Sequence, residues 1–249
     1  MQNPGDKVFG LIGQSMGGPK GGNGKRMFSV VVEGVLAAAG SQTTYTVPLL
    51  GYAAYFDFYL IGAGGGPASG SPATAGGGGA EAVYDTNRSY SPGDVLVLAV
   101  GNGSMASANS VAGGRSTLTQ NGVVIGLANG GGGAGNGSGA AAGAGGSGGF
   151  PNSRPGGAGA QTGTGASGTY GGLGGAGGSY GGGGGSGGFR DLFPALGTTE
   201  GKNVPLIGGK GGAVTNSNAM VNGPGGGITG TGASTGSLPG VGLIFFREA

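Results

Sequence analysis

The sequence predicts an all-β protein: a small β-sandwich with a glycine-rich polyglycine-II helix bundle inserted before the last strand. Three observations support this prediction. Glycine accounts for 73 of the 249 residues and is concentrated in runs. The apolar residues lie in short segments that are rich in β-branched and aromatic side chains. No segment sustains an apolar repeat of about 3.6 residues, so the pattern does not favour α-helices.

The glycine runs call for an unusual kind of order. Residues 171–188 hold 13 glycines in 18 positions, and residues 130–149 hold 12 in 20. Glycine costs about 0.5–1 kcal/mol relative to alanine in regular structure and brings no side chain to bury. Polyglycine-II helices are left-handed, have about three residues per turn and form no internal hydrogen bonds. Packed side by side, they can pair their N–H and C=O groups laterally. Residues 181–185 fit the interior of such a bundle, and residues 130–149 and 156–172 fit outer helices with small side chains.

The glycine content has two other interpretations, collagen and disorder. Collagen is excluded because the G-X-Y repeat is not kept and only 12 prolines are present. Disordered chains carry much charge and few apolar residues, whereas here charged residues make up 8% and the formal net charge is +2. Silk-like disorder of the glycine runs stays open as the alternative to a packed bundle.

The apolar segments define the strands and the domain organisation. Asn121-Gly122 predicts a hairpin, and Ser91-Pro92-Gly93-Asp94 predicts a turn. The last strand is expected to return and pair with the first ones, so that the glycine part is an insertion. Strands are expected at 28–37, 45–50, 55–64, 95–100, 116–120, 122–128 and 241–248. The domains are expected at 1–27 (flexible arm), 28–128 with 240–249 (sandwich) and 129–239 (glycine-rich domain with exposed loops).

The N-terminal arm is basic and lacks the apolar core of a signal peptide. Four of the 11 basic residues, Lys7, Lys20, Lys25 and Arg26, lie in the first 26 positions. The arm is either a solvated flexible segment or one that becomes ordered on docking to a partner. The chain has no cysteine, which suits assembly in a bacterial cytoplasm. No apolar run reaches the roughly 18–20 residues of a membrane span, so we expect no membrane insertion.

The order of strand-to-glycine junctions is the most specific signal in the chain. The junctions are Tyr45-Thr46-Val47-Pro48, the run from Phe58 to Gly66, Ser91-Pro92-Gly93-Asp94 to Val100-Gly101, Ala128-Asn129 before Gly130–Gly133, and Gly240 to Phe246. Over about residues 45–249 this series resembles the glycine-rich domain of bacteriophage tail proteins and prophage tail-fibre tips. The glycine half is also similar to the tip adhesins of some T-even-type phage long tail fibres. The resemblance implies a polyglycine-II sandwich whose loops bind an outer-membrane receptor of the host.

The segments between the glycine runs are enriched in aromatic, Arg, Asn and Pro residues, the types found in interface hot spots and paratope loops. Exposure is expected for Arg154, Arg190 and the Asn-rich segment, because an unpaired polar group is costly to bury. Phe189, Leu192 and Phe193 are either exposed or folded back as lids over the bundle ends. The candidate receptor-binding residues are Phe150, Asn152, Arg154, Tyr170, Tyr180, Phe189, Arg190, Asp191, Phe193, Asn203, Asn216, Asn218, Met220 and Asn222.

Catalysis has little to draw on. Without histidine or cysteine, a Ser-His-Asp triad, a thiol nucleophile and a zinc site are not available. The nine carboxylates are scattered singly, and both Gly-Lys pairs in the glycine runs lack the Ser or Thr of a phosphate-binding loop. We therefore expect no enzyme activity, cofactor or metal. The basic residues are too sparse for a nucleic-acid-binding surface.

Three functions are consistent with the sequence. The first is a tail-tip or tail-fibre adhesin located in the virion, which binds a host outer-membrane protein or surface glycan and contacts other tail proteins through the arm or the sandwich. The second is a structural virion component, such as a tail or head fibre, plug or collar, that the glycine bundle only stiffens. The third is an ice-binding protein with a flat threonine-bearing face, which the bulky Pro-rich loops argue against.

Overall fold

The computed structural model describes residues 26–38, 40–48, 51, 54–67, 75–104, 111–135, 141–174, 181–193, 208–209, 224–227 and 238–247. The N-terminal arm expected at 1–27 lies outside this range apart from its last two residues. The described part is all-β, with two antiparallel sheets and no helix. Its strands are β1 (Arg26–Glu33), β2 (Leu36–Ala37), β3 (Gln42–Thr46), β4 (Tyr55–Ile61), β5 (Ala82–Ser89), β6 (Leu96–Gly101), β7 (Gly103–Ser104), β8 (Ser116–Gln120), β9 (Val123–Ala128) and β10 (Val241–Arg247).

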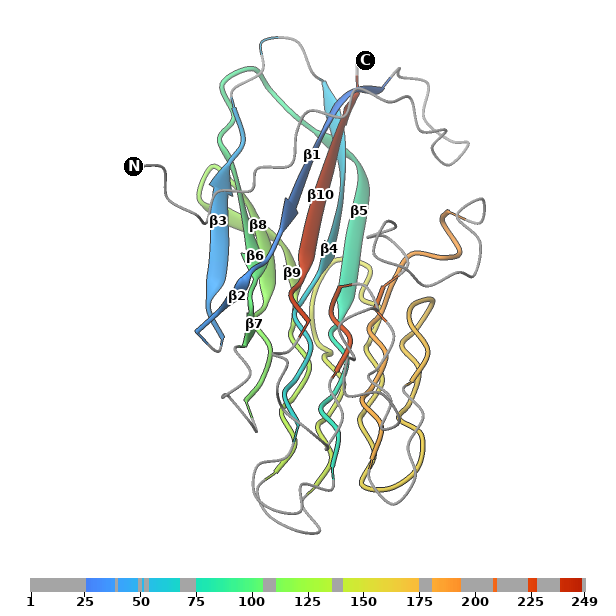
Figure 1. Cartoon of the computed structure of the whole chain (residues 1–249). Coiled ribbons are helices and arrows are strands. Elements are labelled where there is room, and N and C mark those ends of the chain that lie inside the picture. The colour runs from blue at the N-terminus through green and yellow to red at the C-terminus, as the bar shows by residue number, and fades with distance from the viewer. Residues whose placement is uncertain are drawn as a thin grey trace.

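One sheet has the strand order β1-β10-β4-β5, and all its pairings are antiparallel. Strand β10, the last in sequence, lies between β1 and β4 and pairs with both along its length (Figure 1). This confirms the prediction that the C-terminal strand returns to the first ones. Strand β5 forms the edge of this sheet and was not predicted. Its sequence includes Asp85, Asn87 and Arg88, so it lacks the apolar alternation that identifies a strand. In the structure, Asn87 also has a left-handed backbone (φ 61°), which is unusual within a strand.

The second sheet has the order β3-β6-β8-β9, and β2 and β7 form a short parallel pair. Strands β8 and β9 form the predicted hairpin, with positive φ at both Asn121 (53°) and Gly122 (80°). The predicted turn is also present, since Asp94 N–H donates to Ser91 O and Gly93 has φ 98°. Strand β3 lies at 42–46 instead of the expected 45–50. Pro48, which has no N–H to donate to a ladder, lies just beyond its end.

The two sheets pack face to face over one apolar core. Strand β4 supplies Phe56, Phe58 and Leu60, all fully buried, and β10 supplies Ile244 and Phe246. Gly126 in β9 faces the rings, because a Cβ there would lie 2.5 Å from an atom of the Phe58 ring. The remaining core members are Val47, Val83, Tyr90, Leu96, Leu98, Val100, Leu118, Ile125 and Ala128.

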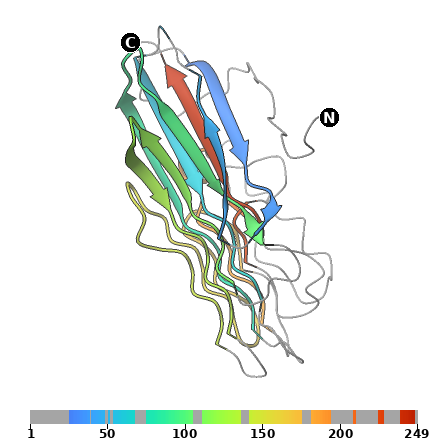
Figure 2. The same cartoon turned by 90° about the vertical axis from the view of Figure 1, so that its left-hand side faces the viewer.

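The glycine segments extend the sandwich beyond the ends of its strands (Figures 1 and 2). Residues 62–66 continue β4, residues 75–80 precede β5, residues 129–135 continue β9 and residues 238–240 precede β10. These segments belong to no helix or strand, and their backbones hydrogen-bond sideways to one another. Segments 62–66 and 75–80, which the sequence analysis included in the sandwich, hydrogen-bond to glycine segments from the later part of the chain.

Segment 75–80 shows how regular these lateral bonds are. The N–H groups of Gly76, Gly79 and Ala82 donate to the carbonyls of residues 160, 157 and 154, in that order. Those of Gly78 and Glu81 donate to residues 132 and 129. Residues three positions apart therefore hydrogen-bond to the same neighbouring segment. Together with Glu81 and Ala82, this segment is bonded to residues of six segments, 62–66, 129–132, 143–146, 154–160, 184–187 and 225.

Exposure follows the same period of three. Gly143 and Gly146 are buried, whereas Ala141, Ala144 and Ser147 are exposed. In segment 181–188 every residue is buried, and seven of the eight are glycines. Glycine therefore occupies most of the positions that face a neighbouring backbone, and the side chains that are buried there are small, such as those of Ala75, Ala80 and Ser186.

Candidate functional site

Three of the segments between glycine runs meet beside strand β5. We call the area formed by residues 150–154, 169–173 and 189–193 the junction surface. Thr169 N–H donates to Pro155 O, Gly188 N–H donates to Thr169 O, and Arg190 N–H donates to Tyr170 O. These backbone bonds fix the three segments relative to one another.

Segment 150–154 also ties the two sheets together. Phe150 forms an antiparallel bridge with Leu127 of β9, and Arg154 forms one with Ala82 of β5. Strands β9 and β5 are the edge strands of their respective sheets. The segment therefore crosses from one edge to the other and covers part of both, which is one of the ways that proteins protect an exposed sheet edge.

A buried carboxylate anchors this crossing. Glu81, which has no exposed surface, accepts hydrogen bonds from the backbone N–H of Gly149 (2.9 Å) and of Asn129 (3.0 Å). It also accepts from Asn129 Nδ2 (3.3 Å) and from the Ser153 hydroxyl. The charge is thus compensated by several aligned neutral donors from two different segments.

Replacing Glu81 by glutamine is expected to lower the free energy of unfolding by about 2–3 kcal/mol. The carboxylate accepts hydrogen bonds from N–H groups on both oxygens, whereas the amide NH₂ of glutamine is itself a donor and would leave some of these N–H groups unpaired. Amide hydrogen exchange at Gly149 and Asn129 should accelerate more than exchange in β6. Urea unfolding and hydrogen exchange measure the two effects, with the exposed Glu33→Gln as the matched control. Equal stabilities of the two variants would contradict the anchoring role.

Arg154 lies at the centre of the junction surface and is buried, with 6% of its surface exposed. The expectation that it is exposed is wrong, because its charge is compensated inside the protein. Its guanidinium forms a two-pronged ion pair with the carboxylate of Asp191 and donates to Gly188 O (2.9 Å). It also stacks over the rings of Tyr84, at 4.6 Å from the centroid, and Tyr170, at 4.9 Å.

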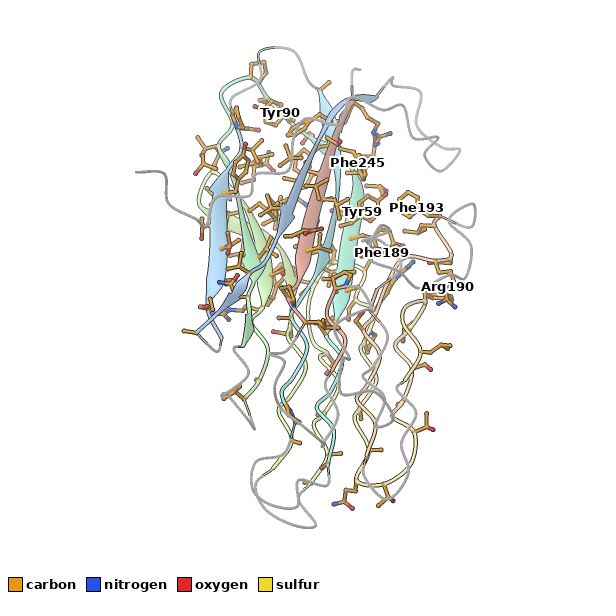
Figure 3. The ribbon with its side chains drawn as sticks, viewed as in Figure 1. Tyr59, Tyr90, Phe189, Arg190, Phe193 and Phe245 are labelled. Carbon is orange, nitrogen blue, oxygen red and sulfur yellow. The ribbon has the colours of Figure 1, made fainter. Side chains whose placement is uncertain are left out.

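Phe189 and Phe193 are buried as well, with 0% and 9% of their surface exposed. Both rings pack edge-on against Tyr59 of β4 with centroids 5.2 Å apart, and Tyr59 also contacts Phe245 of β10 (Figure 3). The two phenylalanines therefore fold back and cover the outer face of the first sheet, and they are not exposed contact residues. Leu192 packs against the same cluster and is partly buried.

Other predicted residues reach solvent. Phe150 is 44% exposed and Tyr170 is 55% exposed. Asn152 and Asp191 are also exposed, and Asn152 Nδ2 donates to Tyr84 O at 3.1 Å. Arg190, at the outer side of its segment, is partly buried and donates to Gly171 O at 2.8 Å (Figure 3).

One member of the surface, Leu173, was not predicted from the sequence. Leu173 is 52% exposed, although a leucine inside a glycine run was not considered as a contact residue. The available signal was its isolation, because an apolar side chain without apolar neighbours in sequence has little to pack against locally. Six predicted residues lie outside the described part of the chain: Tyr180, Asn203, Asn216, Asn218, Met220 and Asn222.

Within the described ranges, no group of three or more acidic residues is placed to hold a metal ion. The same ranges contain no helix long and apolar enough to cross a membrane. What the junction surface offers chemically is exposed aromatic and aliphatic surface beside amide and charged groups. In comparisons with known proteins, no family model matches this chain, and no curated protein is significantly similar to it.

Proposed function

We propose that the glycine segments form a polyglycine-II bundle that includes residues 62–66 and 75–80 as well as the runs after residue 129. The bonding of every third residue to the same neighbour supports this proposal, since polyglycine-II helices have about three residues per turn. So does the closeness of the backbones. An ideal Cβ on Gly78 would lie 1.9 Å from Ala144 O, and one on Gly184 would lie 1.9 Å from Gly157 O.

We further propose that the chain is a bacteriophage tail-tip or tail-fibre adhesin that binds a host cell-surface receptor through the junction surface. One observation carries this proposal. Three inter-glycine segments meet on one side of the molecule, and each leaves side chains in solvent, among them Phe150, Tyr170 and Asp191. Exposed aromatic side chains on loops held by a rigid scaffold are a usual arrangement for binding.

Rigidity is the second supporting feature. Glu81 accepts a hydrogen bond from Ser153, and Arg154 donates to Asp191 and to Gly188 O, so two of the three junction segments are held in place. The glycine segments next to the junction surface are joined to one another by backbone hydrogen bonds at regular intervals. A surface fixed in this way loses little conformational entropy on binding, which favours affinity.

The assignment to phage rests on the resemblance given by the series of strand-to-glycine junctions. In this proposal the protein is part of the virion tail and is assembled in the cytoplasm of the bacterial host. It contacts other tail proteins through the N-terminal arm or the sandwich. Its receptor is an outer-membrane protein or a surface glycan.

The test measures binding of the purified, fluorescently labelled full chain to a panel of bacterial strains and its competition with phage adsorption. Strain-selective binding that blocks adsorption is expected. The double variant Phe150→Ala/Leu173→Ala should weaken binding at least tenfold. Val123→Ala, which changes an exposed apolar residue (65%) on the β8–β9 hairpin, is the matched control and should not. A folded wild-type protein that binds no strain would favour the alternative, a structural virion component.

A further inference from the structure

Tyr170 is the most exposed aromatic side chain of the junction surface and is held in an unusual way. Its backbone adopts a left-handed conformation (φ 49°), which non-glycine residues rarely adopt. Its carbonyl accepts the N–H of Arg190. An aromatic residue that is 55% exposed and kept in such a backbone conformation is not explained by core packing.

The ring of Tyr170 is supported by Arg154. The guanidinium of Arg154 lies 4.9 Å from the ring centroid, and behind it lies Tyr84, which itself stacks on Tyr59 with an angle of 6° between the planes. The guanidinium of Arg154 is fixed in position by its hydrogen bonds to Asp191 and Gly188 O. Its contact with Arg154 therefore fixes the orientation of this largely exposed side chain before any ligand arrives.

Of the two arginines near this ring, Arg154 has its charge neutralised within the protein, which leaves Arg190 as the one uncompensated cation of the junction surface. Arg154 and Asp191 form an ion pair, and Arg190 is partly buried and donates to Gly171 O. An anionic polymer needs several solvent-facing cations for binding, and the junction surface does not provide them. The junction surface also exposes polar groups, among them Asn152 and Thr169.

We propose that the exposed ring of Tyr170 is a stacking platform for a neutral sugar ring, so that the receptor is a surface glycan. This inference rests on the adhesin function proposed above and names its ligand class. A sugar ring presents C–H groups on its faces and hydroxyls at its rim. The C–H face packs on an exposed aromatic ring, and the hydroxyls hydrogen-bond to amide and hydroxyl groups at the edge of the platform.

The experiment uses the full chain and two matched variants. Tyr170→Phe keeps the ring. Tyr170→Asn removes it but suits the left-handed backbone, because asparagine tolerates positive φ. We expect Tyr170→Phe to bind cells within about twofold of wild type and Tyr170→Asn to lose at least tenfold, with equal melting temperatures. Binding should be abolished by mild periodate treatment of the cells, which cleaves sugar diols. It should survive protease treatment of the cells and 1 M salt, in which charge attraction is screened over about 3 Å.

Several outcomes would overturn the inference and leave the adhesin function standing. Binding that is sensitive to protease and resistant to periodate would identify a protein receptor. Binding that is lost in high salt would identify an anionic ligand. Unchanged binding by a folded Tyr170→Asn variant would show that the ring is not part of the binding site. If the folded wild-type protein binds no strain in the panel, the adhesin function fails, and the glycan inference fails with it.

Discussion

Gly184→Ala is expected to unfold the glycine-rich part of the protein, at a cost of about 4 kcal/mol or more. The added Cβ would lie 1.9 Å from Gly157 O and 2.8 Å from Gly79 N. Both atoms belong to neighbouring backbones that are themselves hydrogen-bonded, since Gly157 N–H donates to Gly185 O and Gly79 N–H donates to Gly157 O. No side-chain rotation relieves such a clash. The neighbouring segments must move apart, and the lateral bonds are then lost.

The measurement is chemical denaturation together with hydrogen exchange of the glycine segments. Gly51→Ala is the matched control, because a Cβ at Gly51 meets no atom within 4 Å, and its stability should stay within about 1 kcal/mol of wild type. If Gly184→Ala denatures at the same urea concentration as the control, the backbones are not packed as closely as the structure has them.

Asp57→Ala is the second change with a large expected effect. Asp57 in β4 and Arg247 in β10 form an ion pair in which both residues are more than nine-tenths buried, and Asp57 also accepts the backbone N–H of Asn87 at 2.7 Å. Removing one member of a buried pair leaves the other charge without compensation, which costs about 3–5 kcal/mol. Urea unfolding measures the loss.

Asp85→Ala provides the comparison, because Asp85 pairs with Arg88 at 3.2 Å while both side chains keep about a third of their surface in solvent. Exposed pairs contribute about 0.2–1 kcal/mol, so this variant should remain close to wild type. Similar losses in the two variants would show that burial does not distinguish the two ion pairs.

The parts of the fold that the sequence predicted are those with a local signal. The Asn121-Gly122 turn and the apolar runs of β4, β6 and β10 were found because each depends on a few adjacent residues. Strand β5 was missed for the opposite reason. It contains Asp85, Asn87 and Arg88, and it is held in place mainly by its ladder with β4, a partner that local propensity does not identify.

The candidate site was harder to predict because it depends on long-range contacts. Exposure was expected for Arg154 from the cost of burying a lone charge, but Asp191 lies 37 residues away in sequence and Tyr84 lies 70 residues away. No local pattern identifies these partners. The burial of Phe189 and Phe193 could not be predicted for the same reason, because it depends on contacts with Tyr59, which is more than 100 residues away in sequence.

The position of segment 75–80 determines how late in synthesis the fold can be completed. Its backbone partners include Gly65 on one side and Gly184, Gly187 and Gly225 on the other, and β1 pairs only with β10 in its sheet. Segment 75–80 can therefore complete its lateral bonds only after residue 225 has been synthesised, and β1 can pair only after β10 has been synthesised. Contacts this distant in sequence make folding slow, and the apolar face of the nascent sheet stays open for longer. Residue 225 completes the bonds of segment 75–80 and strand β10 completes the sheet, so both parts of the fold wait for the same late stretch of sequence.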